Sequence, residues 1–422
     1  MLYERWCGVV RERAQERALL DLATQRQWSF AELARAAEDA SEPTEPVVYP
    51  QGHSAEFVFA VLRAWRWRRV VCPLEPGQGP PRVPLPPSGC VHLKLTSATT
   101  GAPRVIAFTG AQLAADAENI VATMGLRSDW PNLGAISMAH SYGFSNLVLP
   151  LLLHGIPLLL APSPLPAAIR RAAEAGSAFT LPAVPALWRA WHEAGAIPPN
   201  VRLAISAGAP LALSLERGVF AASGLKVHNF YGASECGGIA YDRAPQPRQA
   251  EACVGTPLEN VSLSVQAAGC LCVRSRAAGE TYWPDADDTL GPDGFQTSDL
   301  AELKDGEVWL RGRLSDQINV AGRKVSPAAI EQVLGQHPAV DECLVFGVPS
   351  GDADRADAIV ACVVSQGGVS TAELRQFLLQ RLPAWQVPRD WRFVSSLALS
   401  QRGKVSRAEW CRRFEQGQIQ PR

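Results

Sequence analysis

Hydrophobic and polar positions along the chain change their spacing from one region to the next. In residues 28–40 the apolar side chains recur every three to four positions, which predicts a helix, and residues 54–69 predict a second helix before a strand at 70–73. From residue 93 to about 240, short apolar runs alternate with helical patterns, which is typical of a parallel sheet flanked by helices. The strands of that region are expected at 93–96, 135–138, 157–160, 178–181, 203–206 and 226–230.

The longest apolar stretch covers residues 147–161. It is interrupted by His154, Gly155 and Pro157, and it is shorter than the roughly 20 residues that a helix needs to cross a bilayer. It therefore predicts a buried helix, a turn at 155–157 and a buried strand, and no membrane span.

Residues 73–90 contain seven prolines and three glycines. Proline lacks the backbone N–H that a helix or a central strand requires. This segment is therefore expected to be an extended surface loop.

After residue 250 the pattern favours antiparallel strands, at 261–265, 269–274, 301–304 and 307–311. Asp305-Gly306 between the last two is a strong hairpin signal. From about 317 the chain has β and α patterns of its own. We expect an α/β protein with a large domain of helix-flanked sheets and a β-rich subdomain at 1–315, and a small, mobile α+β domain at 316–422.

Composition narrows the function classes. Of 422 residues, 47% are hydrophobic and 19% charged, which allows a large core. The net charge of −1 argues against a nucleic-acid partner. The ten cysteines form no CxxC pair or metal-ligand spacing, and the first residues do not resemble a secretory signal, so we expect a reducing cytoplasm.

Hydroxyl side chains, a glycine and a terminal cation follow the strand expected at 93–96. These residues are Thr96, Ser97, Thr99, Thr100, Gly101 and Arg104. Such a loop can surround a polyphosphate with backbone N–H groups, hydroxyls and a guanidinium. Taken alone, a loop of this composition is more often only a turn.

Three further segments offer chemistry. Residues 229–235 provide the flat ring of Tyr231 and the carboxylate of Glu235, which suits a divalent cation. Asp299 could accept hydrogen bonds from two ribose hydroxyls, and Arg313 could donate to ribose and phosphate. Lys404 follows a glycine near the C-terminus. Each segment alone could be an ordinary strand end, a turn or a solvated side chain without a functional role. Such alternatives do not explain why all of the segments occur together in this order.

Together the segments resemble the adenylate-forming superfamily of acyl-CoA and aryl-CoA synthetases, nonribosomal adenylation domains and luciferases. The resemblance extends from about residue 28 to 407. It includes the phosphate loop at 96–104, a pocket motif with His140 and Gly143, the Gly208-Ala209-Pro210 and 231–235 motifs, Asp299, Arg313, Asp316 and Lys404. Ala98 and Arg104 stand where the family usually has glycine and lysine, and the N-terminal part is short.

The resemblance implies ATP and Mg²⁺ as cofactors and the pantetheine thiol of CoA or of a carrier protein as acceptor. The implied ATP-binding residues include the phosphate loop, Asp299 and Arg313, together with Gly208, Ala209, Pro210, Asn229, Tyr231, Gly232 and Ser234. Lys404, Glu235 and His140 are the implied catalytic residues, with Glu235 as the metal ligand. Asp316 would be the hinge, about which the small domain rotates to present Gly322 to pantetheine.

The same resemblance places the acid pocket at His140, Phe144, Ser206 and Gly232. Relatives that activate amino acids carry an aspartate near the pocket motif, whereas residues 139–146 here contain no acidic side chain. A buried ammonium without a carboxylate is costly, so we expect an aryl or acyl carboxylate without an α-amino group. His140 could alternatively be a satisfied core histidine.

Three functions stay open from the sequence. The first is an acid–thiol ligase. The second is an enzyme that stops at the adenylate or transfers it to a nucleophile other than a thiol. The third is a catalytically weak homologue that binds a nucleotide or an acid.

Overall fold

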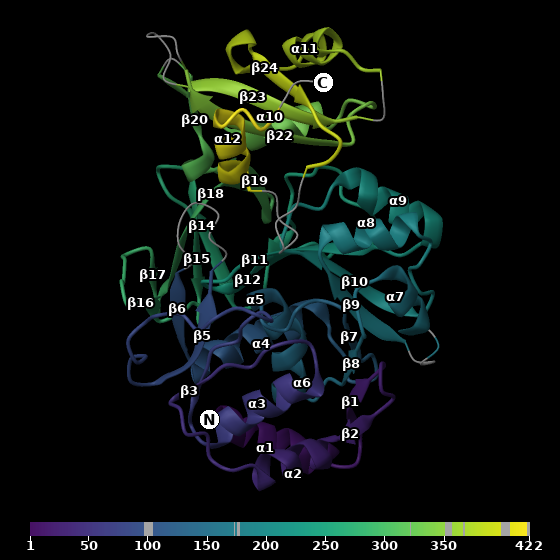
Figure 1. The fold of residues 1–422 in the computed structure, drawn as a ribbon, viewed down its shortest axis with the longest axis vertical. Helices are drawn as coiled ribbons and strands as arrows, with labels where there is room; N and C mark the ends of the chain where they lie inside the picture. Colours follow the sequence, from purple (N-terminus) through teal and green to yellow (C-terminus); the bar gives the residue numbers. More distant parts are fainter. Residues whose placement is uncertain are drawn as a thin grey trace.

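The computed structural model describes residues 1–96, 104–172, 174, 178–320, 322–350, 357–365, 368–397 and 406–419. Figure 1 shows the N-terminal and central elements stacked below, and the elements after residue 317 at the opposite end of the molecule. The mixture of sheets and helices confirms the predicted α/β class.

The large sheet has nine strands in the order β13-β12-β11-β10-β9-β7-β8-β1-β2. Its members are β1 (Arg17–Asp21), β2 (Gln27–Ser29), β7 (Asn132–Gly134), β8 (Leu158–Leu160), β9 (Phe179–Ala183), β10 (Val201–Ala207), β11 (Val227–Ala233), β12 (Gly237–Tyr241) and β13 (Thr256–Pro257). The strands from β11 through β1 pair in parallel, as the alternating pattern predicted.

One strand prediction is wrong. The strand expected at 135–138 lies earlier, at β7, and residues 135–138 form no strand. The apolar run continues past the strand, but the backbone there turns toward the segment that begins at His140. An added Cβ at Gly143 would lie 1.9 Å from the carbonyl oxygen of Ser137, so this close approach requires a glycine.

Helices cover the sheets. They are α1 (Leu2–Arg13), α2 (Phe30–Asp39), α3 (Ala55–Arg66), α4 (Gly110–Met124), α5 (Ser141–Gly143), the π-helical η1 (Phe144–Val148), α6 (Leu149–His154), α7 (Pro166–Ala172), α8 (Pro185–Glu193) and α9 (Leu213–Ser223). Ser29 and Thr109 begin α2 and α4 with complete capping boxes. The apolar stretch at 147–161 forms the predicted helix, a left-handed Gly155 and β8.

A second sheet has the order β16-β6-β5-β4-β3. Its strands are β3 (Val47–Val48), β4 (Val70–Val71), β5 (Cys90–Leu95), β6 (Val105–Thr109) and β16 (Thr281–Trp283). The connection from β4 to β5 is the predicted proline-rich loop. Since β5 and β6 are antiparallel neighbours, Thr96 and Arg104, which flank the segment between the two strands, lie side by side.

The third sheet contains β14 (Val261–Val265), β15 (Cys270–Ser275), β17 (Leu290–Gly291), β18 (Gly294–Lys304) and β19 (Glu307–Arg313). Asp305 and Gly306 both have positive φ, 53° and 79°, which matches a type I′ hairpin. The turn register pairs Ala301 with Leu310, and a register shift between Leu300 and Ala301 then places Asp299 directly opposite Arg313.

The C-terminal elements are β20 (Ile318–Val320), β21 (Arg323–Val325), α10 (Pro327–Leu334), β22 (Glu342–Pro349), β23 (Asp357–Val364), α11 (Thr371–Leu379), β24 (Asp390–Phe393) and α12 (Arg407–Glu415). They bury two apolar clusters whose members all come from residue 318 onward. The domain division at 315/316 stays a prediction.

Among the residues that the structure describes, no helix has the length and apolar character required to cross a bilayer.

Candidate active site

Parallel strands bring two of the predicted motifs to one edge of the large sheet. Gly208-Ala209-Pro210 follow β10, and Tyr231 and Gly232 end β11. Ser206 of β10 pairs in register with Asn229 of β11. Because the carboxyl ends of adjacent parallel strands share an edge, the structure brings these motifs together at the position where α/β sheets bind ligands.

Asp299 connects this edge to the third sheet. Its Oδ2 accepts a hydrogen bond from the Tyr231 hydroxyl, and its Oδ1 accepts from Arg313 Nε at 2.8 Å. Burial and the Asp299 charge raise the pKa of Tyr231, so its hydroxyl remains a donor. A carboxylate has about four acceptor positions, so Asp299 retains capacity for two ribose hydroxyls.

Glu235 lies in the turn between β11 and β12 and is partly shielded from solvent. Its Oε1 accepts a hydrogen bond from the Tyr282 hydroxyl of β16 at 3.2 Å. Burial raises the pKa of Glu235, while the Tyr282 hydrogen bond and the charges of Arg313 and Arg104 oppose that rise. A cation bound beside Glu235 would favour its ionised form.

One carboxylate is a sparse metal site. Within the described ranges, no group of three or more His, Cys, Asp or Glu side chains could hold a metal ion. Magnesium, however, is commonly held by one or two carboxylates together with the phosphates of a substrate. Glu235 therefore fits an ion that arrives with ATP rather than one bound by the protein alone.

Arg104 stacks on Tyr282, the residue whose hydroxyl donates to Glu235. Its guanidinium carbon is 3.2 Å from the centre of the Tyr282 ring, and its Nη2 donates to Asp287 Oδ2 at 2.6 Å. Thr96 and Arg104 close the base of the phosphate loop, since Thr96 N donates to Arg104 O and Arg104 N donates to Thr96 Oγ1, each at 2.9 Å. Ser97, Ala98, Thr99, Thr100 and Gly101 lie outside the described residues.

His140 is joined by a residue that the sequence did not single out. Its Nε2 lies 3.1 Å from Oε1 of Glu75, which the proline-rich loop contributes. The Ser137 hydroxyl donates to the same carboxylate oxygen. This half-buried pair therefore places a carboxylate beside the pocket motif, where the sequence stretch 139–146 has none.

The other predicted pocket residues differ in exposure. Phe144 is buried, with its ring 4.4 Å from that of His92 and 6.5 Å from that of Phe57. Ser206 is fully buried, and its hydroxyl has no hydrogen-bond partner in the described part of the chain. Gly232 is exposed. A lining role for Phe144 and Ser206 stays a prediction.

Asp316 forms an ion pair with Arg407, which follows the predicted catalytic Lys404 by three positions in the sequence. Arg407 Nη1 lies 3.0 Å from Asp316 Oδ2, Arg407 Nη2 pairs with Glu331, and Arg407 Nε donates to Val345 O at 3.1 Å. Gly322 lies in the turn between β20 and β21. Lys404 lies outside the described residues, so its place relative to Glu235 stays a prediction.

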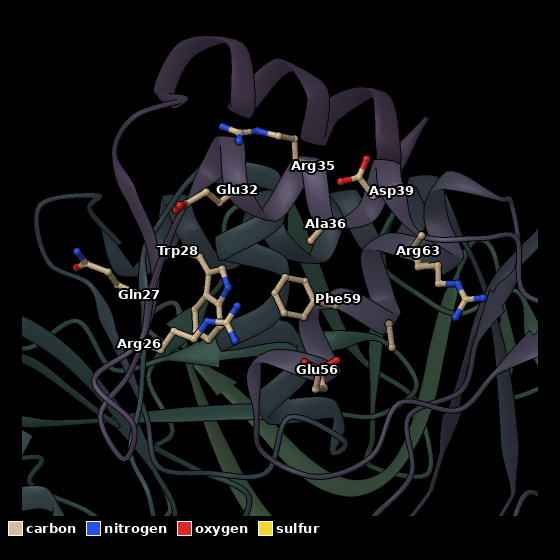
Figure 2. Close-up of a pocket in the computed structure, with 12 residues that line it drawn as sticks. Arg26, Gln27, Trp28, Glu32, Arg35, Ala36, Asp39, Glu56, Phe59 and Arg63 are labelled. Carbon is tan, nitrogen blue, oxygen red and sulfur yellow. The ribbon is translucent and has the colours of Figure 1, made fainter.

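A groove of about 660 Å³ lies elsewhere, between α2, α3 and the end of β2. Figure 2 shows the rings of Trp28 and Phe59 in it, 5.8 Å apart, with charged side chains around them. None of the predicted site residues lines it. Figure 1 places α2 and α3 at the opposite end of the molecule from the C-terminal elements.

Comparison with known proteins agrees with this arrangement. The family model described as AMP-binding enzyme matches residues 12–283, and the model of the AMP-binding enzyme C-terminal domain matches 329–404. The chain is 31% identical over 335 residues to a probable 2-succinylbenzoate–CoA ligase of Mycobacterium tuberculosis, covering 76% of this chain and 83% of that protein.

A feruloyl-CoA synthase of Amycolatopsis sp is 27% identical over 79% of this chain and 72% of its own length. The fold is shared with ATP-bound MatB from Rhodopseudomonas palustris, with a TM-score of 0.86 and 19% identity over 98% of this chain and 99% of that one. The resemblance inferred from the motifs is confirmed, and the chain belongs to the AMP-binding enzyme family of the adenylate-forming superfamily.

Proposed function

We propose that the protein activates an aryl or acyl carboxylic acid with ATP and transfers the acyl group to the pantetheine thiol of CoA. The observation that carries the proposal is the convergence of Tyr231 and Arg313 on Asp299, beside the Glu235 turn. This arrangement offers a ring for adenine, a carboxylate for ribose and a cation for phosphate.

The adenylation step requires alignment and charge neutralisation rather than proton transfer, because the acid is already ionised. A carboxylate oxygen of the acid attacks the α-phosphorus of ATP, and the bond to pyrophosphate breaks. The thiol then releases its proton to solvent, its sulfur attacks the acyl carbon, and the bond between that carbon and the oxygen of AMP breaks. Magnesium, when bound, would offset negative charge on the triphosphate, with Glu235 as its protein ligand.

The proposed acid lacks an α-amino group. In the described residues, two carboxylates lie beside the pocket motif, and both already have partners: Glu75 pairs with His140, and Asp116 pairs with Lys94 and accepts from the Ser145 hydroxyl. The names of the two relatives above specify aromatic acids, 2-succinylbenzoate and feruloyl. We therefore favour an aryl carboxylate.

Pyrophosphate release tests this function directly. A panel of aryl, acyl and amino acids, assayed with ATP and with or without CoA, should show release for aryl or acyl acids and thioester only when CoA is present. Adenylate without thioester would favour a non-thiol acceptor. ATP binding without release for any acid would favour the catalytically weak homologue.

Asp299→Ala should raise the KM for ATP more than the KM for the acid. Loss of a charged hydrogen-bond acceptor weakens binding by about 1.5–3 kcal/mol, roughly 10- to 100-fold. Steady-state pyrophosphate release at varied ATP gives this ratio. Glu302→Ala, which removes an exposed ion pair with Arg311 on the same sheet, is the matched control. An unchanged KM for ATP would show that the ribose binds elsewhere.

Arg104→Ala should slow pyrophosphate formation while leaving the melting temperature within about 2 °C of wild type. The pair with Asp287 is exposed, at 43% and 37%, and exposed ion pairs contribute only about 0–1 kcal/mol. Asp287→Ala is the control, because it breaks the same pair and leaves the cation. Equal slowing in both variants would indicate that the pair, rather than the cation, matters.

A further inference from the structure

A buried lysine precedes the phosphate loop in the sequence. Lys94 belongs to β5, two residues before Thr96, and its side chain is only 3% exposed. Its Nζ lies 3.7 Å from Oδ2 of Asp116 on α4, and 4.4 Å from the centre of the Phe108 ring. Within the described residues, Nζ makes no hydrogen bond.

Asp116 in turn holds the segment that follows Glu235. Its Oδ1 accepts from the backbone N–H of Gly238 at 3.3 Å, and its Oδ2 accepts from the Ser145 hydroxyl at 2.6 Å. A Cβ at Gly237 would lie 2.0 Å from Asp116 Oδ1. The carboxylate therefore packs directly against the turn, leaving no room for a side chain there.

The pair links three motifs that are far apart in sequence. Lys94 lies near the end of β5, two residues before Thr96, which directly follows the strand. Gly237 and Gly238 begin β12, immediately after Glu235 and Cys236. Ser145 follows Phe144 of the predicted acid pocket.

Stability alone does not account for this pair. Burial lowers the pKa of Lys94, and Asp116, Cys236 and Glu235 partly oppose that effect. Buried ion pairs can often be replaced by apolar residues with no loss of stability. Asp116, however, also accepts from the backbone N–H of Gly238 in β12, three residues after Glu235. This contact holds the strand that follows the Glu235 turn.

We propose that Lys94 and Asp116 are positioning residues that fix the distance between the phosphate loop and the Glu235 turn, and so set the affinity for MgATP. The inference rests on the proposed function, in which these two segments bind the triphosphate and its magnesium. Neither side chain touches the nucleotide. They act through Thr96, which follows β5, and through Gly237 and Gly238, which begin β12 directly after the Glu235 turn.

The test compares Lys94→Met, Asp116→Asn and the double variant. Each single change leaves one buried charge unpaired and should lower the melting temperature. The double variant removes both charges and should regain most of it. It should nevertheless bind MgATP about tenfold more weakly by calorimetry, the effect typical of removing outer-shell partners, with the KM for the acid unchanged. The amides of Thr96 and Gly238 should also exchange hydrogen faster.

The matched control is Lys226→Met with Asp242→Asn. It also removes a buried pair, in which Lys226 Nζ lies 2.5 Å from Asp242 Oδ2. Lys226 precedes β11, whereas Tyr231 and Gly232 lie near the other end of that strand. Its MgATP affinity should equal that of wild type. A Lys94→Met/Asp116→Asn protein with wild-type affinity and exchange would overturn the positioning role. Pair-dependent MgATP binding without pyrophosphate release from any acid would support it and overturn the proposed ligase instead. A wild type that binds no MgATP would overturn both.

Discussion

Glu216→Ala is expected to destabilise the large domain by about 3–5 kcal/mol, because it removes the one carboxylate that pairs with buried Arg248 and one of the two that pair with buried Lys226. Glu216 is fully buried on α9. It accepts from Lys226 Nζ, and from the backbone N and Nε of Arg248, both at 2.9 Å. Lys226 would keep Asp242, but Arg248 would keep only the carbonyl oxygens of Leu211, Glu251 and Cys253.

Calorimetry would show this as a melting temperature lowered by about 5–10 °C, since one kcal/mol corresponds to roughly 2–4 °C or less in a domain of this size. Burial by itself raises the pKa of Glu216, but Arg248 and Lys226 outweigh it, and the net pKa is lowered. The stabilisation is therefore present above the unfolded-state pKa and lost as the pH falls through the folded-state value. The Glu216→Ala deficit should shrink in acid.

Glu302→Ala is the control for a surface carboxylate. Its ion pair with Arg311 is exposed, at 61% and 45%, so the melting temperature should change by less than about 2 °C. If Glu216→Ala had the same melting temperature as Glu302→Ala, the result would show that water replaces the lost carboxylate.

The order of elements followed from local pattern. The alternation of apolar runs with helical periods predicted the parallel sheet, and Asp305-Gly306 predicted the hairpin of β18 and β19. The ion pair of Asp299 with Arg313, fourteen residues apart, also depends on the register shift between Leu300 and Ala301, which the turn signal does not predict. Such local signals can be recognised in the sequence because turn residues and the spacing of apolar side chains each depend on only a few neighbouring residues.

The contacts that complete the site were not predictable in this way. Glu75 comes from a loop whose prolines indicated only extension, and Tyr282 comes from a strand in which it pairs with Ile106 of β6, 176 residues earlier in the sequence. The buried charge of Lys94 was visible as a lysine between leucines, but its meaning depends on Asp116. Each of these residues acquires its role from a long-range contact, which periodicity does not encode.

The misplaced strand at 135–138 has the same origin. An apolar run shows that a segment is buried, but it does not show where the strand ends. Here the ladder stops at Gly134 and the buried residues continue as a turn toward His140. The position of that turn depends on Glu75 and Gly143, both outside the run.

Lys404→Ala is expected to lower adenylate formation by about 100-fold or more, the effect of removing one charge-stabilising group from a transition state. The family resemblance places this lysine on the carboxylate and α-phosphate oxygens, where negative charge shifts as the new bond forms. It should act only in the first half-reaction, because the small domain is expected to rotate about Asp316 before the thiol attacks. Thioester formation from a supplied acyl-adenylate and CoA should therefore stay within about threefold of wild type.

Rapid-quench assays of each half-reaction separate the two steps. The control is Lys304→Ala, which removes an exposed lysine on β18. If both half-reactions fell together while the control stayed active, Lys404 would serve both steps, and the rotation would not withdraw it.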